Sequence, residues 1–444
     1  MTQGKFNAEP SKGFFVNMLT KDIPLDRAIM DLIDNSIDGA KSQILISTEV
    51  KEIKASDFFV EINFNNQYFE IKDNCGGFSK QAAIDYVFML GKPINSGDQS
   101  GTDSVGRFGV GMKRGLFKIG NYFVVETKNG IDHFKVEEDV NLWLEEKGKW
   151  EFDFVDVNNA DGKIDVNGTF IKVTNLNPAV QQDFSLSTFE NSLKKEIRKT
   201  FNYSIKSGIK IRVNGQLLDA EPITFLKSDS LKPYYLKEII EDVKVEIFVG
   251  IGEPNPNEAG WYIYCNDRLM VDKDTSNLTG WDGGKKFYDD SGVQKYHNKV
   301  AMFRGLVFFS SNDSSKLPMT TTKWGIDVNS TLYKTVRSKM INAMKQVLGQ
   351  LNKLDNAEQR SQIVANSTLV DIKTHHSDLS LSSTFVFPEI QKSGFDDNTV
   401  QIKYRVEKEL VLKTQEYLEL KTYGEVGLAT FQYFVKMKKI NDGE

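Results

Sequence analysis

The stretch from Leu25 to Ala40 constrains the fold more than any other part of the chain. Apolar and small residues recur in it with the 3.6-residue period of a helix, which predicts a helix with one buried stripe. Asp31, Asn35 and Asp38 fall at i, i+4 and i+7, together on the opposite face. Alone, such a row is most simply a solvated acidic face, and its interpretation depends on the motifs that follow. The stripe consists of Leu25, Ala28, Ile29, Leu32, Ile33, Ser36, Ile37 and Ala40.

Composition narrows the class of protein. The chain has 444 residues, 40% of them hydrophobic, and a net charge of −5, which suits about two to four domains. No apolar run approaches the roughly 20 residues that span a bilayer, and no secretory signal is visible, so we expect a cytoplasmic protein without a membrane segment. The two cysteines, Cys75 and Cys265, are far apart, and there are four histidines. These counts argue against a disulfide scaffold, a Cys/His zinc site and a His-dependent triad.

Strand and helix signals predict an α+β fold, in which helices cover one face of a mostly antiparallel sheet. A polar stretch at 175–183 marks the first boundary, so we expect domains at 1–180, 181–354 and 355–444. The expected strands of the first domain are Phe58–Phe64, Tyr68–Lys72, Asn121–Lys128, Gly130–Val136, Trp150–Val155 and Thr169–Val173. Beyond it we expect helices at Ser187–Ile205, at Thr331–Leu354 and from Glu407, and strands at Ile209–Val213, Val243–Gly250, Trp261–Cys265 and Thr399–Val406.

A second motif, IKDNCGGF at 71–78, follows a predicted strand. Asp73 at the strand end can present a carboxylate to a flat, amine-bearing ring, while Gly76 and Gly77 let the backbone come close. A turn that favours Asp explains the same residues equally well.

A third motif is GRFGVGMKRG at 106–115. A glycine-rich turn that leads into a helix aims backbone N–H groups at an anion. Alone it is weak evidence, because a convincing dinucleotide-binding βαβ unit and a GxxxxGK[ST] P-loop are both missing.

In this order, the three motifs resemble those of the GHKL ATPase superfamily, which includes gyrase-type topoisomerases, MutL-type mismatch-repair proteins, the ninety-kilodalton heat-shock chaperones and the MORC ATPases. The motif resemblance covers residues 12–175 and extends more loosely to 350. It implies a Bergerat-type α/β sandwich ATPase domain, a ribosomal-protein-like α+β transducer domain and a small mixed C-terminal region. It also implies ATP and Mg²⁺ as ligands, and hydrolysis of ATP to ADP and phosphate.

The resemblance assigns roles to individual residues. Asn35 would hold the magnesium ion, Asp31 would be the general base, and Asp73 would accept from the exocyclic amine of adenine. Asp38 would organise water around the metal and the adenine edge. A lid at Lys92–Ser104 would cover the triphosphate. Further nucleotide contacts would come from Gly77, Gly106, Gly109, Val110, Gly111, Lys113 and Thr169, the last through its hydroxyl in the adenine–aspartate network.

The transducer of this superfamily sends one basic residue to the γ-phosphate. Lys323, in LPMTTTKWGID, is the best match, with a solvated surface lysine as the alternative. The segment YCNDRLMV at 264–271 also looks like a MORC-type transducer, and its Arg268 receives no chemical role.

The chain departs from the family pattern at two motifs. Asp31 replaces the general-base glutamate and withdraws the carboxylate by about one methylene, so slow turnover or a relayed water is expected. Asp34 is an alternative base, although it points about 60° away from the Asp31/Asn35 row. Cys75 replaces the first glycine of DxGxG and is expected to be a packing residue, and Gly39 stands in the place of the alanine in ExxxNxxDA.

For function, the resemblance implies an ATP-dependent homodimer that acts as a switch or clamp, in DNA transactions or prokaryotic defence against foreign nucleic acid. A chaperone-like or signalling ATPase with a protein client and a catalytically weak nucleotide-binding scaffold are the alternatives. Net charge mildly favours the protein client. Residues 422–439 suit a docking or dimer helix as well as a core helix. A possible nucleic-acid surface is the basic set Lys194, Lys195, Arg198 and Lys199.

Overall fold

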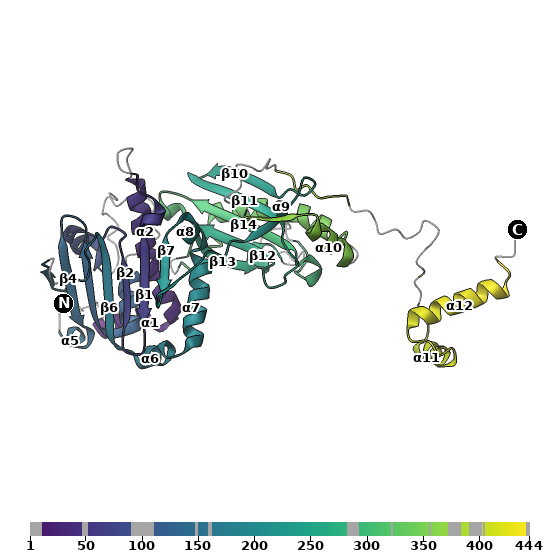
Figure 1. Ribbon diagram of the computed structural model, residues 1–444, viewed down its shortest axis with the longest axis horizontal. Helices are drawn as coiled ribbons and strands as arrows, with labels where there is room; N and C mark the ends of the chain where they lie inside the picture. The colour runs from purple at the N-terminus through teal and green to yellow at the C-terminus, as the bar shows by residue number, and fades with distance from the viewer. Residues whose placement is uncertain are drawn as a thin grey trace, which may run out of the picture. The chain divides into compact units, whose positions relative to one another are not determined.

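A computed structural model describes residues 11–46, 52–89, 111–146, 150–158, 162–281, 293–320, 323–354, 357–371, 383–389, 402 and 405–440. The chain divides into two units, Met1–Pro388 and Glu389–Glu444, and each is described by itself. Two large sheets, one small sheet and their helices form the first unit (Figure 1).

The first sheet has eight strands in the order β5-β4-β3-β6-β2-β1-β7-β8. All neighbours are antiparallel except β1 and β7, which confirms the predicted α+β fold. Because the sheet includes strands beyond residue 180, the domain limits at 180 and 354 stay predictions. The strands are β1 Phe59–Phe64, β2 Phe69–Asp73, β3 Gly120–Lys128, β4 His133–Asp139, β5 Phe154–Asp156, β6 Gly168–Leu176, β7 Lys210–Val213 and β8 Gln216–Leu217.

Helix α2 (Leu25–Leu45) lies at the centre of the helical layer and is buried on nearly every side. Between Ala28 and Asp38 the only residue that is not buried is Asn35. The reading of Asp31 and Asp38 as a solvated face is therefore wrong, because other elements cover that side of the helix as well. The surrounding helices are α1 Lys12–Lys21, α3 Lys80–Ala82, η2 Ala83–Val87, α4 Gly111–Ile119, α5 Val140–Glu145 and α6 Pro178–Phe184.

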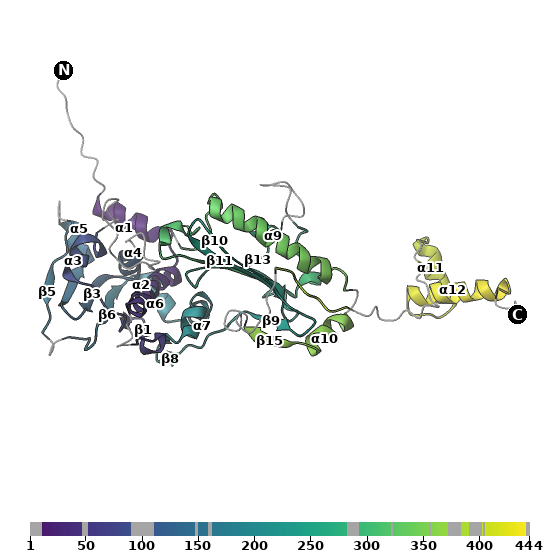
Figure 2. The same ribbon diagram turned by 90° about the horizontal axis from the view of Figure 1, so that it is seen from above.

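The second sheet has five strands in the order β10-β11-β14-β12-β13. Helix α9 (Thr331–Leu351) lies along one face of it (Figure 2). The helix expected at Ser187–Ile205 is divided near Phe201 into α7 (Ser187–Thr200) and α8 (Asn202–Ser207), and both contact β13. The strands are β10 Tyr234–Ile240, β11 Val243–Ile251, β12 Gly260–Cys265, β13 Arg268–Asp274 and β14 Phe303–Ser310, and nearby lie β9 Thr224–Lys227, β15 Thr368–Asp371 and α10 Ala357–Ala365.

The second unit contains two helices, α11 (Lys408–Tyr417) and α12 (Tyr423–Met437). Val426 is the only buried residue of either helix, so the described part of α12 is not an ordinary core helix. The described part of the strand expected at Thr399–Val406 is not a strand, and the remainder lies outside the described residues. No helix in the described ranges is long and apolar enough to cross a bilayer.

Helix α2 meets the loop after β2 at Gly39 and Cys75, and both of these positions depart from the family pattern. A Cβ atom on Gly39 would lie 2.6 Å from the carbonyl oxygen of Cys75 and 3.3 Å from its Cβ atom. Cys75 is 3% exposed, and its backbone carbonyl oxygen is the atom that an alanine at position 39 would meet first. Position 39 therefore has no room for a methyl group while the loop follows this path, and Cys75 is a packing residue of the core.

We expect Gly39→Ala to lower the free energy of unfolding by about 1–3 kcal/mol, because the added methyl group overpacks this contact. Adding Cys75→Gly should recover part of the loss, because it removes the facing side chain and lets the loop shift. Urea unfolding followed by tryptophan fluorescence measures both effects. Gly349→Ala on α9 is the control, since a Cβ atom there has nothing within 4 Å. Equal unfolding midpoints for the Gly39 and Gly349 variants would contradict the tight contact.

Candidate functional site

Asp73 ends β2 and is 5% exposed. Its Oδ2 accepts from the Ser36 hydroxyl at 2.7 Å, and its Oδ1 accepts from the backbone N–H groups of Cys75 and Thr169 at 2.9 and 3.1 Å. Burial raises the pKa of Asp73, and these three hydrogen bonds oppose the rise. The carboxylate is thus held rigidly and keeps lone pairs for a further donor, which suits the predicted contact with an amine.

Close backbone contacts around Asp73 depend on two glycines. Gly77 has φ +63°, and a Cβ atom on it would overlap with the carbonyl oxygen of Lys128. A Cβ atom on Gly168 would overlap with the carbonyl oxygen of Asp73. This approach of β6 lets the backbone N–H of Thr169 reach the carboxylate. The role predicted for the Thr169 hydroxyl stays a prediction.

The row Asp31, Asn35 and Asp38 on α2 shows three different environments. Asn35 is exposed, so its side chain is available to a ligand. Asp38 is 7% exposed and has a polar partner within the chain. Asp31 is 1% exposed. The side-chain carbonyl oxygen of an exposed Asn is a hard ligand of the kind that Mg²⁺ accepts alongside water and phosphate oxygens.

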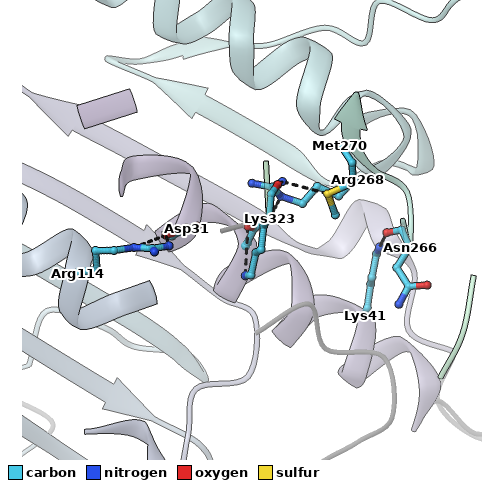
Figure 3. A network of polar contacts seen from close by, with 8 residues as sticks. Asp31, Lys41, Arg114, Asn266, Arg268, Met270 and Lys323 are labelled. Atoms are coloured by element: carbon cyan, nitrogen blue, oxygen red, sulfur yellow. Dashed lines mark hydrogen bonds and ion pairs between the residues drawn. The ribbon is translucent and has the colours of Figure 1, made fainter. Parts of the chain in front are cut away.

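Asp31 forms an ion pair with Arg114 of α4 (Figure 3). Arg114 donates to Asp31 Oδ2 from Nε at 3.1 Å and from Nη2, whereas Asp31 Oδ1 is buried and has no hydrogen-bond partner among the described residues. Burial raises the pKa of Asp31, and the charges of Lys323 and Arg114 oppose the rise. Our sequence interpretation gave no role to Arg114, although a second cation directly after Lys113 in the glycine motif was a visible signal.

Lys113 is 1% exposed, and its ammonium group donates to the backbone carbonyls of Val87 (2.6 Å) and Met89. Burial lowers the pKa of Lys113 to about 7. The described structure therefore places this lysine on the end of η2, and its predicted contact with the nucleotide stays a prediction. Gly111 begins α4. The remaining members of the glycine motif, Gly106, Gly109 and Val110, lie outside the described residues, as does the expected lid at Lys92–Ser104.

Asp34 is paired with two cations from the second sheet and its loops. Arg268 Nε donates to Asp34 Oδ1 at 2.8 Å, and Lys323 Nζ lies 3.4 Å from Asp34 Oδ2. Arg268 also donates to the backbone carbonyl of Lys323 (Figure 3). A role for Arg268 could not be predicted, because nothing in the linear order of the chain places it beside residue 34. Lys323 is not a solvated surface lysine, since it is 5% exposed.

Lys323 is presented by a tight turn. The turn is closed by hydrogen bonds from the N–H of Lys323 to the carbonyl of Thr320 and from the N–H of Thr320 to the carbonyl of Gly325. Lys323 has φ +59°, a conformation that costs a non-glycine residue free energy and persists only when neighbours fix it. The next residue, Trp324, supplies that support, because its ring lies 3.2 Å from the Arg27 guanidinium and 4.4 Å from that of Arg268.

Five charged side chains thus gather around α2, and we call them the charge cluster: Asp31, Asp34, Arg114, Arg268 and Lys323. Each is at most 8% exposed. The cluster has three cations for two carboxylates, and in the ranges that the structure describes Arg268 Nη2 is buried without a hydrogen-bond partner. Because an uncompensated buried charge is costly, this arrangement suits an anionic group such as a phosphate.

Comparison with known proteins agrees with this geometry. Residues 23–161 match the family model of the histidine kinase-, DNA gyrase B- and HSP90-like ATPases. That segment contains α2, Asp73, α4 and the strands β1 to β5. No curated protein matches the chain, and its closeness to the MORC and MutL proteins stays a prediction. The chain therefore carries, in residues 23–161, an ATPase domain of the GHKL superfamily.

Proposed function

We propose that this protein is a slow, Mg²⁺-dependent ATPase that acts as an ATP-gated dimeric switch. The charge cluster carries this proposal, because it joins the predicted general base to the predicted phosphate-binding lysine in one buried site. Asp31 and Lys323 are 292 positions apart in the sequence (323 − 31). Asp73 recognises the adenine amine, and Gly77, Gly168 and Thr169 form the surface around that contact.

A bound Mg²⁺ would neutralise part of the phosphate charge. Asn35 is the residue that would hold it, as the one exposed polar side chain in the central part of α2. Asp38 would order water beside the metal and the adenine edge. Gly106, Gly109, Val110, Gly111 and Lys113 contribute the lid contacts to the phosphates, as the resemblance implies.

Asp31 acts on the attacking water through Oδ1, the oxygen that Arg114 leaves unpartnered. The water oxygen forms a bond to the γ-phosphorus, and the bond from that phosphorus to the β–γ bridging oxygen breaks. The electron pair of the broken bond leaves with ADP, and the proton of the water passes to Asp31. The shorter aspartate makes slow turnover the expected behaviour.

Lys323 connects nucleotide binding to the transducer-like segment. In the described structure it pairs with Asp34, and a γ-phosphate is a stronger competitor for the same ammonium group because it carries more charge. Exchange of Lys323 from Asp34 to phosphate changes the docking of its turn on α2. This exchange is a two-state element that a ligand can bias, and we propose that it closes a homodimer.

Fewer residues indicate the partner of this switch than indicate its nucleotide. Three of the four cations that suggested a nucleic-acid surface on α7 are ion-paired within the chain, Lys194 with Glu190, Arg198 with Glu221 and Lys199 with Asp272. Helix α12 exposes Leu428, Phe431, Tyr433, Phe434 and Met437. DNA transactions or defence against foreign nucleic acid remain the first candidate function. These observations favour a second candidate, in which the C-terminal unit binds a protein client.

The first test is ATP binding and turnover with Mg²⁺. We expect Asp73→Asn to weaken ATP binding by about ten- to a hundredfold in calorimetry, because a buried charged acceptor is lost. Asn35→Ala should abolish the Mg²⁺ dependence of turnover while adenine recognition remains. Asp242→Asn is the control, since Asp242 is a carboxylate that forms an ion pair with Lys316 beside the second sheet. Undiminished binding by Asp73→Asn would contradict the adenine site.

A second prediction concerns Lys323. We expect Lys323→Ala to reduce turnover by roughly a hundredfold, because a donor to the developing phosphate charge is removed. It should also abolish dimers formed with a non-hydrolysable ATP analogue, measured by sedimentation velocity. Lys41→Ala is the matched control, because Lys41 contacts the carbonyl of Asn266 across the same region at 2.6 Å but does not touch the charge cluster. Normal turnover and dimerisation by Lys323→Ala would contradict the coupling.

A third prediction follows from the lowered pKa of Lys113. Burial lowers the pKa of this group to about 7, and a nearby phosphate raises that pKa by favouring the charged form. ATP binding should therefore take up protons near pH 7, and the uptake should fall at pH 5, where Lys113 is already charged. Calorimetry in two buffers of different ionisation enthalpy measures the uptake. In Lys113→Arg it should fall, and equal uptake would contradict a contact between Lys113 and phosphate.

A further inference from the structure

Arg114 is a buried cation that the family pattern gives no role. It lies on α4, three residues after the last glycine of the GxxGxG string, and is 8% exposed. Its described ion-pair partner is Asp31. We propose that Arg114 is a positioning residue, which fixes the Asp31 carboxylate so that one chosen oxygen faces the attacking water. This inference rests on the proposed ATPase activity.

The contact between the two side chains is asymmetric. Two donors of Arg114, Nε and Nη2, point to Asp31 Oδ2, and within the described part of the chain Oδ1 is buried without a hydrogen-bond partner. Two donors on one oxygen restrict rotation of the carboxylate, because any rotation would break both hydrogen bonds. A purely structural arginine–carboxylate pair is often bidentate and uses both oxygens. Here the arrangement instead reserves Oδ1 for a further donor, and a water molecule is the donor that hydrolysis requires.

The backbone of α4 makes this contact possible. A Cβ atom on Gly115 would lie 3.1 Å from Leu32 Cδ2 and 3.3 Å from the carbonyl oxygen of Ala28, so only a small residue allows this approach of α4 to α2. A Cβ atom on Gly111 would lie 3.4 Å from the Asp31 Cβ atom. The two glycines therefore bring α4 onto the turn of α2 that carries Asp31, and Arg114 lies between them in the sequence.

This arrangement compensates for the short side chain of Asp31, which has one methylene group fewer than glutamate. A short carboxylate cannot reach toward the nucleotide, so its orientation has to be fixed from outside. Arg114 also supplies charge where it is needed, because a base must be ionised to accept a proton. Asp34 disfavours the ionised form of Asp31, whereas Lys323 and Arg114 favour it. If the ammonium group of Lys323 moves to the phosphate, Arg114 is the cation that stays paired with Asp31.

The test compares Arg114→Gln, Arg114→Lys and the unmodified protein in steady-state ATP hydrolysis from pH 5 to 9. We expect Arg114→Gln to lower kcat by roughly a hundredfold, because general-base catalysis depends on orientation, with little change in KM for ATP. The acidic limb of its kcat–pH profile should move to higher pH by about one unit or more, because the nearby positive charge is gone. Arg114→Lys should lower kcat but leave that limb in place, since it keeps the charge and loses the two-donor geometry.

Lys118→Gln is the control on the same helix, because Lys118 contacts the carbonyl of Thr20 at 3.0 Å and does not touch Asp31. Unchanged kcat and pH profile in Arg114→Gln, with normal hydrolysis by the unmodified protein, would overturn the proposal. If Arg114→Gln does not fold, Arg114→Lys decides, because unmodified kcat in that variant would show that the two-donor geometry is not used. Absence of hydrolysis in the unmodified protein would instead overturn the proposed function.

Discussion

The ion pairs between Asp34 of α2 and two cations from distant parts of the chain are the interaction on which the site depends. Arg268 and Lys323 reach this carboxylate only when the second sheet and its loops pack against the helical layer of the first. Each of these three residues is at most 5% exposed, so none of the three charges can be left unpaired without a large cost. The packing of the two sheets and the ion pairs of the site therefore depend on each other. A ligand that breaks the ion pairs must also change the packing.

Close backbone approach is the second constraint, and it determines where side chains have to be absent. At Gly168 a methyl group would collide with the backbone of Asp73, and at Gly39 it would collide with the backbone of Cys75. In the second case, the absence of a side chain at position 39 lets the loop at Cys75 come close to α2, and both positions depart from the family pattern.

Much of the site could be predicted because its residues lie in local patterns. The period of residues 25–40 predicts α2, and the position of Asp73 at a strand end follows from the alternation before it. The pairing of Arg114 with Asp31 was not predictable, because it depends on how closely two helices approach. Strand β14 was also missed. Seven of its eight residues are buried, so it has no polar alternation to distinguish it from a buried helix.

By itself, the sequence determined the order of the motifs, the α+β class and the residues that face one another along α2, since these depend on short-range periodicity and on the allowed conformations of glycine. Only the tertiary structure decided which charges meet. Asp31 and Asp34 are three positions apart on one helix, yet one pairs with α4 and the other with residues more than 230 positions later. Their partners, and the single carboxylate oxygen left open at Asp31, follow from burial, because buried charges must find compensation wherever the packed chain brings it.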